Sequence, residues 1–168
     1  LHAQSGLEDC ARRAGFFMSS EEVLLEGNSS GVDTSGAMNA VAMGPQHEQG
    51  LFQLYCACTP LSVRRTWGMT LSDWRQSIEK PPGREEHIVV EREGRLIAWL
   101  GLGHTASATQ CHAMVHPDAA QLCQPLAQLG LRHAGKCQWL VPRDQEQLAG
   151  VLQRRGLLET SAYFSLVR

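Results

Sequence analysis

The sequence predicts an α+β fold, in which one mixed β-sheet carries helices on both faces. Two apolar runs meet at Glu93-Gly94, a pattern typical of a tight β-hairpin because glycine tolerates a positive φ. The second run, residues 95–103, is apolar on both of its faces, as expected of a central strand in a covered sheet. From residue 108 onward, strand patterns alternate with helical ones. An antiparallel start followed by this alternation indicates one mixed sheet.

The first half of the chain is predicted to hold short elements around a polar linker. A helical segment stops at Gly15, a strand follows, and a run of Gly, Ser, Asn and Asp then interrupts the pattern. Further on, Leu51, Leu54 and Cys58 recur at helical spacing. The expected elements are a helix at 5–14, a strand at 16–27, a linker at 28–36, a strand at 37–44 and helices at 46–58 and 71–78.

The second half is predicted to be more regular. Its expected elements are a hairpin at 87–103, strands at 108–116, 137–142 and 157–168, and helices at 118–135 and 144–155. Pro125 leaves two interpretations of the first helix. If Asp118 caps the helix, Pro125 lies in the second turn and the helix kinks. If the helix begins at Pro125, the residues from Asp118 form an irregular turn.

The segments around Gly15 and Gly156 resemble each other. Aligning the two glycines superimposes LEDCARRAGFFMSSEEVLL on LAGVLQRRGLLETSAYFSL, each a helix, a glycine stop and a strand. The similarity arises either by chance or because the first unit is the end of a preceding copy of the domain. The second interpretation divides the chain into a remnant at 1–27, a linker at 28–36 and a domain at 37–168. An apolar strand needs a partner, so we expect the strand of the remnant to lie against the main sheet.

Composition argues against several classes of partner. The 15 Lys and Arg balance 17 Asp and Glu without a basic block, so no nucleic-acid partner is expected. No apolar run reaches the roughly 18 residues of a membrane helix, and the first residues lack a signal-peptide pattern. The six cysteines lie in apolar segments, which predicts buried, reduced thiols and a cytoplasmic location. No metal site is expected, because His112 and His116 would lie about 13 Å apart on a strand.

Residues 34–168 resemble the GNAT-superfamily N-acetyltransferases element by element. The motifs are the hairpin VVEREGRLIAWLGL, the strand HAMVHPD running into a helix, and the ending LAGVLQRRGLLETSAYFSLV. The resemblance implies a GNAT-like fold and direct transfer of an acetyl group from acetyl-CoA to an amine of a small molecule or peptide. Residues 1–27 look like the end of an earlier such domain, as in tandem members of the superfamily.

The resemblance also implies where acetyl-CoA binds. Strands 108–116 and 137–142 would splay apart, and the backbone of Met114 and Val115 would pair with the pantetheine arm like an added strand. The pyrophosphate would lie on the following loop and helix start, where free amides and the helix dipole favour anions. If that helix begins at Pro125, the amides of Leu126 and Ala127 face the phosphate.

The loop departs from the family's phosphate-binding pattern, Gln/Arg-x-x-Gly-x-Gly/Ala. Counted from VHP, the pattern falls on residues 120–125, with Cys123 and Pro125 at the glycine and small-residue positions. A Cβ limits how closely the backbone approaches a phosphate, and proline has no N–H to donate. Moving the pattern one residue later restores the leading Gln but puts Gln124 and Leu126 at these positions. A thiol at a helix start, as at Cys123, is expected to have a lowered pKa.

Two side chains are candidates for proton transfer. His112 is the titratable group best placed on the first splayed strand, and histidine suits a general base. Family members carry an Asn and a proton-donating Tyr at the positions of Gln145 and Leu152 here, so Tyr163 in the last strand is the substitute candidate for the acid. A structural role in the sheet is the alternative for both His112 and Tyr163.

Two functions stay open from the sequence. The first is an acetyl-CoA-dependent N-acetyltransferase whose acceptor pocket is lined by Tyr55, Trp67 and Trp74, although core packing is the alternative role of these aromatic residues. The second is a GNAT-fold domain that has lost acyl transfer and serves as a binding or structural module in a homodimer or a tandem protein. The altered loop and the missing Asn and Tyr favour the second, whereas the retained strand pattern favours the first.

Overall fold

The structure is a computed structural model that describes residues 2–4, 8–31, 39–61, 64, 70–77, 83–133 and 135–167. Its strands are β1 (His2–Gln4), β2 (Phe17–Ser29), β3 (Ala40–Ala42), β4 (Arg84–Arg92), β5 (Arg95–His104), β6 (Thr109–Val115), β7 (Gly135–Pro142) and β8 (Leu158–Val167). Its α-helices are α1 (Glu8–Arg13), α2 (Glu48–Cys58), α4 (Leu71–Ser77), α5 (Cys123–Gly130) and α6 (Glu146–Arg154). Two 3₁₀ helices, η2 (Pro45–His47) and η3 (Pro117–Leu122), precede α2 and α5.

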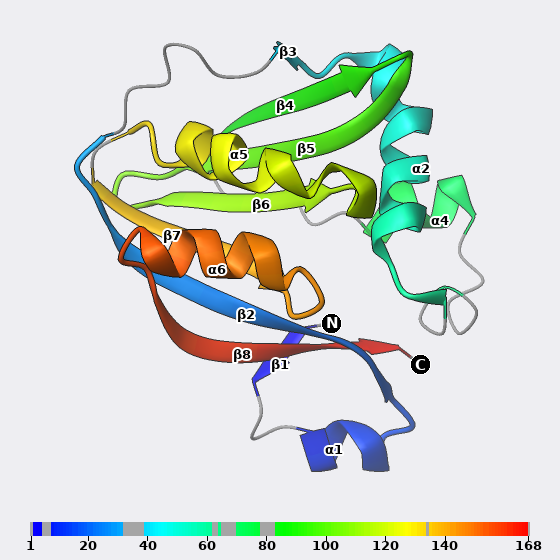
Figure 1. Cartoon of the computed structure of the whole chain (residues 1–168). Helices are drawn as coiled ribbons and strands as arrows, with labels where there is room; N and C mark the ends of the chain where they lie inside the picture. Colours follow the sequence, from blue (N-terminus) through cyan, green and yellow to red (C-terminus); the bar gives the residue numbers. More distant parts are fainter. Residues whose placement is uncertain are drawn as a thin grey trace.

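All eight described strands belong to one sheet, in the order β1-β8-β2-β7-β6-β5-β4-β3. Neighbouring strands are antiparallel except β6 and β7, which are parallel. Figure 1 shows α5 and α6 across one face, with α2 and α4 on the other. Each face has its own core, a large one beneath α5 and α6 and a smaller one beneath α2 and α4. The predicted fold class, a mixed sheet with helices on both faces, is confirmed.

The β4–β5 hairpin forms as predicted. Glu93 and Gly94 both have positive φ, 53° and 74°, which is the requirement of a two-residue type I′ turn. The following strand is covered on both sides, with Leu100 in the larger core and Trp99 packed against the smaller one. The turn, and the alternation of side chains between the two faces of a strand, depend only on neighbouring residues. Both can therefore be predicted from the sequence without knowledge of the sheet order.

β2 lies inside the sheet, between β7 and β8 (Figure 1). Residues 22–29 pair with β7, and residues 17–26 pair with β8. Val23 and Leu25 point into the larger core and are buried. The strand therefore lies against the main sheet, as the sequence analysis expects of an apolar strand. The division into a remnant, a linker and a domain stays a prediction, and residues 32–38 of the expected linker lie outside the described part.

The two repeated helix-glycine-strand units end their helices in the same way. Gly15 and Gly156 both have positive φ, 83° and 89°. In the first unit, the N–H of Phe16 donates to the carbonyl of Ala11, five residues earlier. In the second, the N–H of Leu157 donates to the carbonyl of Leu152. This bond and the left-handed glycine define a Schellman motif, so the sequence similarity extends to the helix stop.

The cysteines are only partly as predicted. All six are free thiols, but only Cys111, Cys123 and Cys137 are buried. Cys56 and Cys58 are half-buried and Cys10 is exposed, because α1 lies beyond the edge of the sheet rather than over a face (Figure 1). No helix in the described part of the chain combines the length and the apolar composition needed to cross a membrane.

Candidate functional site

The parallel strands β6 and β7 separate toward their carboxyl ends. Residues 109–112 of β6 pair with residues 137–140 of β7, and His112–Leu140 is the last pair. Both strands then continue, β6 to Val115 along β5 and β7 to Pro142 along β2. The strands therefore diverge beyond this pair into a gap, which we call the splay.

The register of β6 determines which backbone groups face the splay. The N–H of His116 donates to the carbonyl of Ile97 at 2.9 Å, so alternate residues of β6 bond to β5. The N–H and C=O of Met114 therefore point toward β5. Those of Ala113 and Val115 point toward β7. In the register of the His112–Leu140 pair the N–H of Ala113 is directed at Leu140, so the groups that face the splay are the C=O of Ala113 and the N–H of Val115. The backbone of Met114 does not face this gap.

The thiol of Cys58, at the end of α2, lies 3.2 Å from the carbonyl oxygen of Val115 and donates to it. Burial, together with the nearby negative charge of Asp144, raises the pKa of Cys58 to about 12. Cys58 is therefore a protonated hydrogen-bond donor at neutral pH, not a nucleophile. One carbonyl at the splay is already used within the chain.

The buried thiol of Cys58 predicts a pH dependence of stability. The native pKa of Cys58, about 12, lies above the ordinary value of 9.0. The protonated thiol therefore makes its full contribution to the free energy of unfolding below pH 9, and this contribution is lost as the pH rises toward 12. The free energy of unfolding of the wild type, measured in urea with a reductant, is expected to fall more steeply above pH 9 than that of Cys58→Ala. Equal slopes would contradict the assignment.

Two polar residues follow β7 at the same end of the sheet. Partial burial raises the pKa of Asp144, and the neighbouring Glu22 carboxylate adds to the increase. Gln145 is the N-cap residue of α6, and its side-chain oxygen is buried without a hydrogen-bond partner among the described residues. A buried acceptor without a donor is costly, which suits a position that a ligand N–H completes.

A groove of about 340 Å³ lies between the start of α5 and α6. Its walls are formed by residues at the η3–α5 junction and on one side of α6: Ala120, Gln121, Cys123, Gln124, Glu146, Gln147, Gly150, Val151 and Arg154. Cys123 and Gln124, two of the predicted cofactor-binding residues, line this groove. The side chains of Leu126 and Ala127 are buried in the larger core.

The start of α5 differs from both interpretations of Pro125. The helix begins at Cys123, so Pro125 is its third residue, inside the first turn where the missing N–H breaks no helical bond. The N–H groups of Leu126 and Ala127 come after Pro125, so they are not among the first three N–H positions of the helix. The N–H of Cys123 already donates to Ala120 O. Burial raises the pKa of the Cys123 thiol, contrary to the lowering expected at a helix start.

No family model matches the sequence, and no curated protein matches it. Among solved structures, it is similar to an acetyltransferase of the GNAT family from Colwellia psychrerythraea, with a TM-score of 0.52 and 9% identity over 97% of this chain. The GNAT domain of S. lividans PAT matches 84% of this chain with a TM-score of 0.50 and 11% identity. A functionally unknown conserved protein from Staphylococcus epidermidis matches 98% of it with a TM-score of 0.61 and 10% identity. The chain has the GNAT N-acetyltransferase fold.

The lengths of these solved structures differ from that of this chain. The chain spans 96% of the S. lividans GNAT domain, but 63% of the Colwellia acetyltransferase and 67% of the Staphylococcus protein. The similarity to these structures confirms the fold that the sequence resemblance implies.

The order of the strands places the two candidates for proton transfer far apart. His112 is the last paired residue of β6 and marks the point where the splay opens. Tyr163 lies on β8, opposite Glu22, with β7 and β2 between it and β6. Three strand spacings correspond to roughly 14 Å, far beyond hydrogen-bond reach. The structure does not bring His112 and Tyr163 together.

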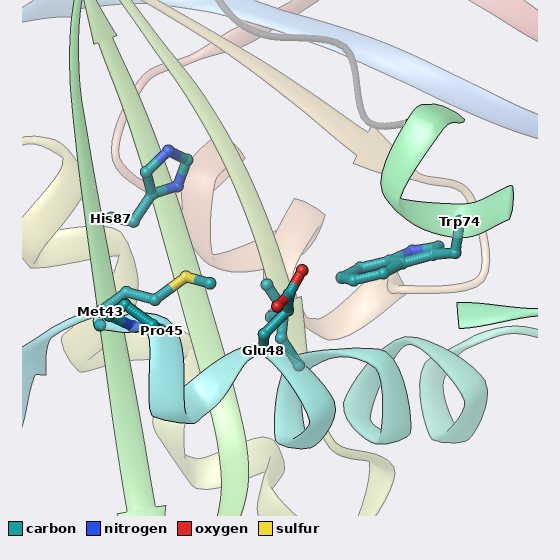
Figure 2. Close-up of a pocket in the computed structure, with 7 residues that line it drawn as sticks. Met43, Pro45, Glu48, Trp74 and His87 are labelled. Carbon is teal, nitrogen blue, oxygen red and sulfur yellow. The ribbon is translucent and has the colours of Figure 1, made fainter. Parts of the chain in front are cut away.

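Two of the aromatic residues predicted to line an acceptor pocket pack against other aromatic rings. Tyr55 and Trp74 form a cluster with Phe52, at centroid distances of 5.5 to 6.4 Å. Trp74 also lines a second cavity of about 270 Å³ on this face of the sheet (Figure 2). Trp67 lies outside the described residues. In the described part of the chain, no three His, Cys, Asp or Glu side chains gather closely enough to hold a metal ion.

Proposed function

We propose that this domain is an acetyl-CoA-dependent N-acetyltransferase, which transfers the acetyl group directly to an amine of a small molecule or a peptide. The observation that carries the proposal is the splay, where the C=O of Ala113 and the N–H of Val115 offer an edge on which an extended amide chain can bind as an added strand. The GNAT fold supports it.

The residues around the splay fit acetyl-CoA in part. The buried oxygen of Gln145 lacks a donor, and an amide N–H of the pantetheine arm would supply one. The groove between α5 and α6 provides the amides of Gln121 and Gln124 and the guanidinium of Arg154 for the phosphates. The first turn of α5 contributes less, because the N–H of Cys123 is used and Pro125 has none. We therefore propose that side chains, rather than a glycine-rich loop, hold the phosphates.

Acetyl-CoA would supply a thioester: the acceptor amine would attack its acyl carbon, the C–S bond would break, and CoA would leave as a thiolate that takes a proton from solvent. In this proposal the N–H of Val115, which faces the splay, donates to the acyl oxygen as charge develops on it. His112, at the point where the splay opens, is the group proposed to accept the proton of the amine. Cys58 takes no covalent part, because its thiol stays protonated.

A second candidate function is cofactor binding, or partner binding, without transfer. The observation in its favour is the bond from Cys58 to Val115 O, which occupies a group that the added strand needs. In this case the domain serves as the structural half of a homodimer or a tandem protein. Turnover distinguishes the two functions, because only the first releases free CoA in the presence of an amine.

A substitution in the groove tests cofactor binding while leaving the fold intact. A Cβ atom at Gly150 meets only the flexible end of Arg154, at 3.4 Å, and the space beyond it is the groove, so Gly150→Leu is expected to fold and to fill the groove. Calorimetric titration with acetyl-CoA should show binding to the wild type and at least tenfold weaker binding to Gly150→Leu. Gln153→Leu, on the exposed side of the same helix, is the matched control and should bind like the wild type. No binding to the wild type at millimolar cofactor would exclude the enzyme.

A further inference from the structure

The pairing between β2 and β8 follows the internal repeat of the sequence. When Gly15 is aligned with Gly156, Glu22 of β2 corresponds to Tyr163 of β8, and these two residues pair with each other. The alignment turns every other pair of this ladder into another pair of the same ladder. The exchanged pairs are Phe17–Val167 with Glu26–Leu158, Met18–Leu166 with Leu25–Glu159, Ser20–Ser165 with Leu24–Ser161, and Glu21–Phe164 with Val23–Ala162. A pseudo-two-fold axis therefore passes between Glu22 and Tyr163.

The irregularities of the ladder obey the same symmetry. The register shifts twice, and the extra residues are Ser19 on β2 and Thr160 on β8. The alignment of the two glycines makes Ser19 and Thr160 equivalent. Any antiparallel pair of strands has a local two-fold axis, but nothing in one ladder requires this axis to fall where an alignment of helix-ending glycines puts it. The repeat is therefore a property of the structure as well as of the sequence.

The symmetry extends to β1 and α1. β1 pairs with β8 as the end of β7 pairs with β2, because the pair Gln4–Tyr163 has the same place as the pair Pro142–Glu22. α1 follows β1 after the same number of residues as α6 follows β7. The strand order β1-β8-β2-β7 therefore has two equivalent halves. We call β1, α1 and β2 the N-terminal unit, and β7, α6 and β8 the C-terminal unit.

The two units differ in what lies beside them. β7 pairs with β6, whereas β1 is the last strand at its edge of the described sheet. Figure 1 shows α5 beside α6, and α1 on the opposite side of the β2–β8 pair without a described helix beside it. Leu152 and Val23 are buried in the larger core, but their counterparts Ala11 and Phe164 are only half-buried. In the described part of the chain, no strand or helix takes the places beside the N-terminal unit that β6 and α5 take beside the C-terminal unit.

We propose that the N-terminal unit closes a second domain with the same fold, whose body packs on the outer edge of β1 and on α1. That body supplies a strand parallel to β1, in the place of β6, and a helix against α1, in the place of α5. The C-terminal unit follows the body of its own domain in the chain. The body of the second domain therefore comes before residue 2 in the same polypeptide. The proposal concerns assembly and does not depend on acetyl transfer.

In this arrangement the two domains exchange one strand each. β2 of the second domain lies between β7 and β8 of the first, and β8 of the first lies between β1 and β2 of the second. All ladder bonds of the two exchanged strands therefore cross from one domain to the other. The joint between the domains is part of the sheet rather than a flexible linker.

The thiol of Cys10 reports on the proposed surface. Cys10 is exposed on α1, and the alignment makes it equivalent to Val151, which is half-buried in the groove between α5 and α6. A body packed against α1 is expected to slow the alkylation of Cys10 by iodoacetamide at least fivefold. Mass spectrometry measures this rate in residues 1–168 and in the full product of the natural gene, and Cys10→Ser identifies the signal in each.

Asn28→Cys, made in the Cys10→Ser background, is the matched control. It places a thiol at an exposed position of β2, opposite Lys136 on β7, and should react at the same rate in both proteins. The reading frame before residue 1 gives an independent test. It is expected to encode a body in which a β-hairpin precedes a strand and a helix, in the order of β4, β5, β6 and α5.

Three results would overturn the proposal. They are a reading frame without such a body, an equal rate of alkylation of Cys10 in the two proteins, and an equal slowing of alkylation at Cys10 and in Asn28→Cys. If the longer protein fails to fold, the reading frame decides the outcome.

Discussion

Leu25→Asp is expected to abolish the native fold. Leu25 is fully buried in the middle of β2, opposite Trp139 on β7 and Glu159 on β8. Losing its burial costs about 1.5–3 kcal/mol, and an unpaired buried carboxylate adds several more. The sum approaches the total stability of a typical domain, about 5–15 kcal/mol. Circular dichroism and urea denaturation should show no cooperative transition for this variant.

Asn28→Asp is the matched control for this variant. It introduces the same charge in the same strand, but at an exposed position opposite Lys136 on β7. Its unfolding midpoint should stay close to that of the wild type. Cooperative unfolding of Leu25→Asp with near wild-type stability would contradict the position of β2. Removal of residues 1–27 is expected to have the same outcome as Leu25→Asp, because it separates β7 from β8.

Gly130→Ala is expected to destabilise the fold by about 1–3 kcal/mol, the usual cost of overpacking a core. Gly130 is the last residue of α5, and a Cβ built there would overlap the six-membered part of the Trp139 indole. The ring is fully buried in the larger core. The loss outweighs the roughly 1 kcal/mol that alanine gains over glycine in a helix. Urea denaturation measures the difference.

Gly150→Ala provides the comparison within α6. Its Cβ would meet only the end of Arg154, so the helix propensity of alanine is not offset by a clash. This variant should be as stable as the wild type or more stable by up to about 1 kcal/mol. A smaller loss in Gly130→Ala than in Gly150→Ala would show that α5 does not approach Trp139 in this way.

The sequence was informative where structure depends on neighbouring residues. The turn at Glu93-Gly94 and the helix stops at Gly15 and Gly156 follow from backbone chemistry within a few residues. The sheet order does not, because pairs such as Leu24–Leu140 join residues more than a hundred positions apart. Nothing local distinguishes a strand that lies at the edge of a sheet from one inserted between two others.

The site was predictable in outline and not in detail. The strands that splay were expected, but the phase of β6 against β5 decides that Ala113, not Met114, faces the gap. The contact from Cys58 to Val115 has no sequence signal, since it joins a helix to a distant strand. One signal was available for the groove. Gly150 is a glycine inside a helix, which costs about 1 kcal/mol and often marks a close approach or a binding surface.

Amide hydrogen exchange of β6 tests the central claim that acetyl-CoA binds as an added strand in the splay. Without the cofactor, the N–H of Val115 faces the gap, whereas that of Met114 bonds to β5. Saturating acetyl-CoA is expected to slow the exchange of Val115 by at least tenfold and to leave Met114 unchanged. Unchanged exchange at Val115 in millimolar acetyl-CoA would contradict the account.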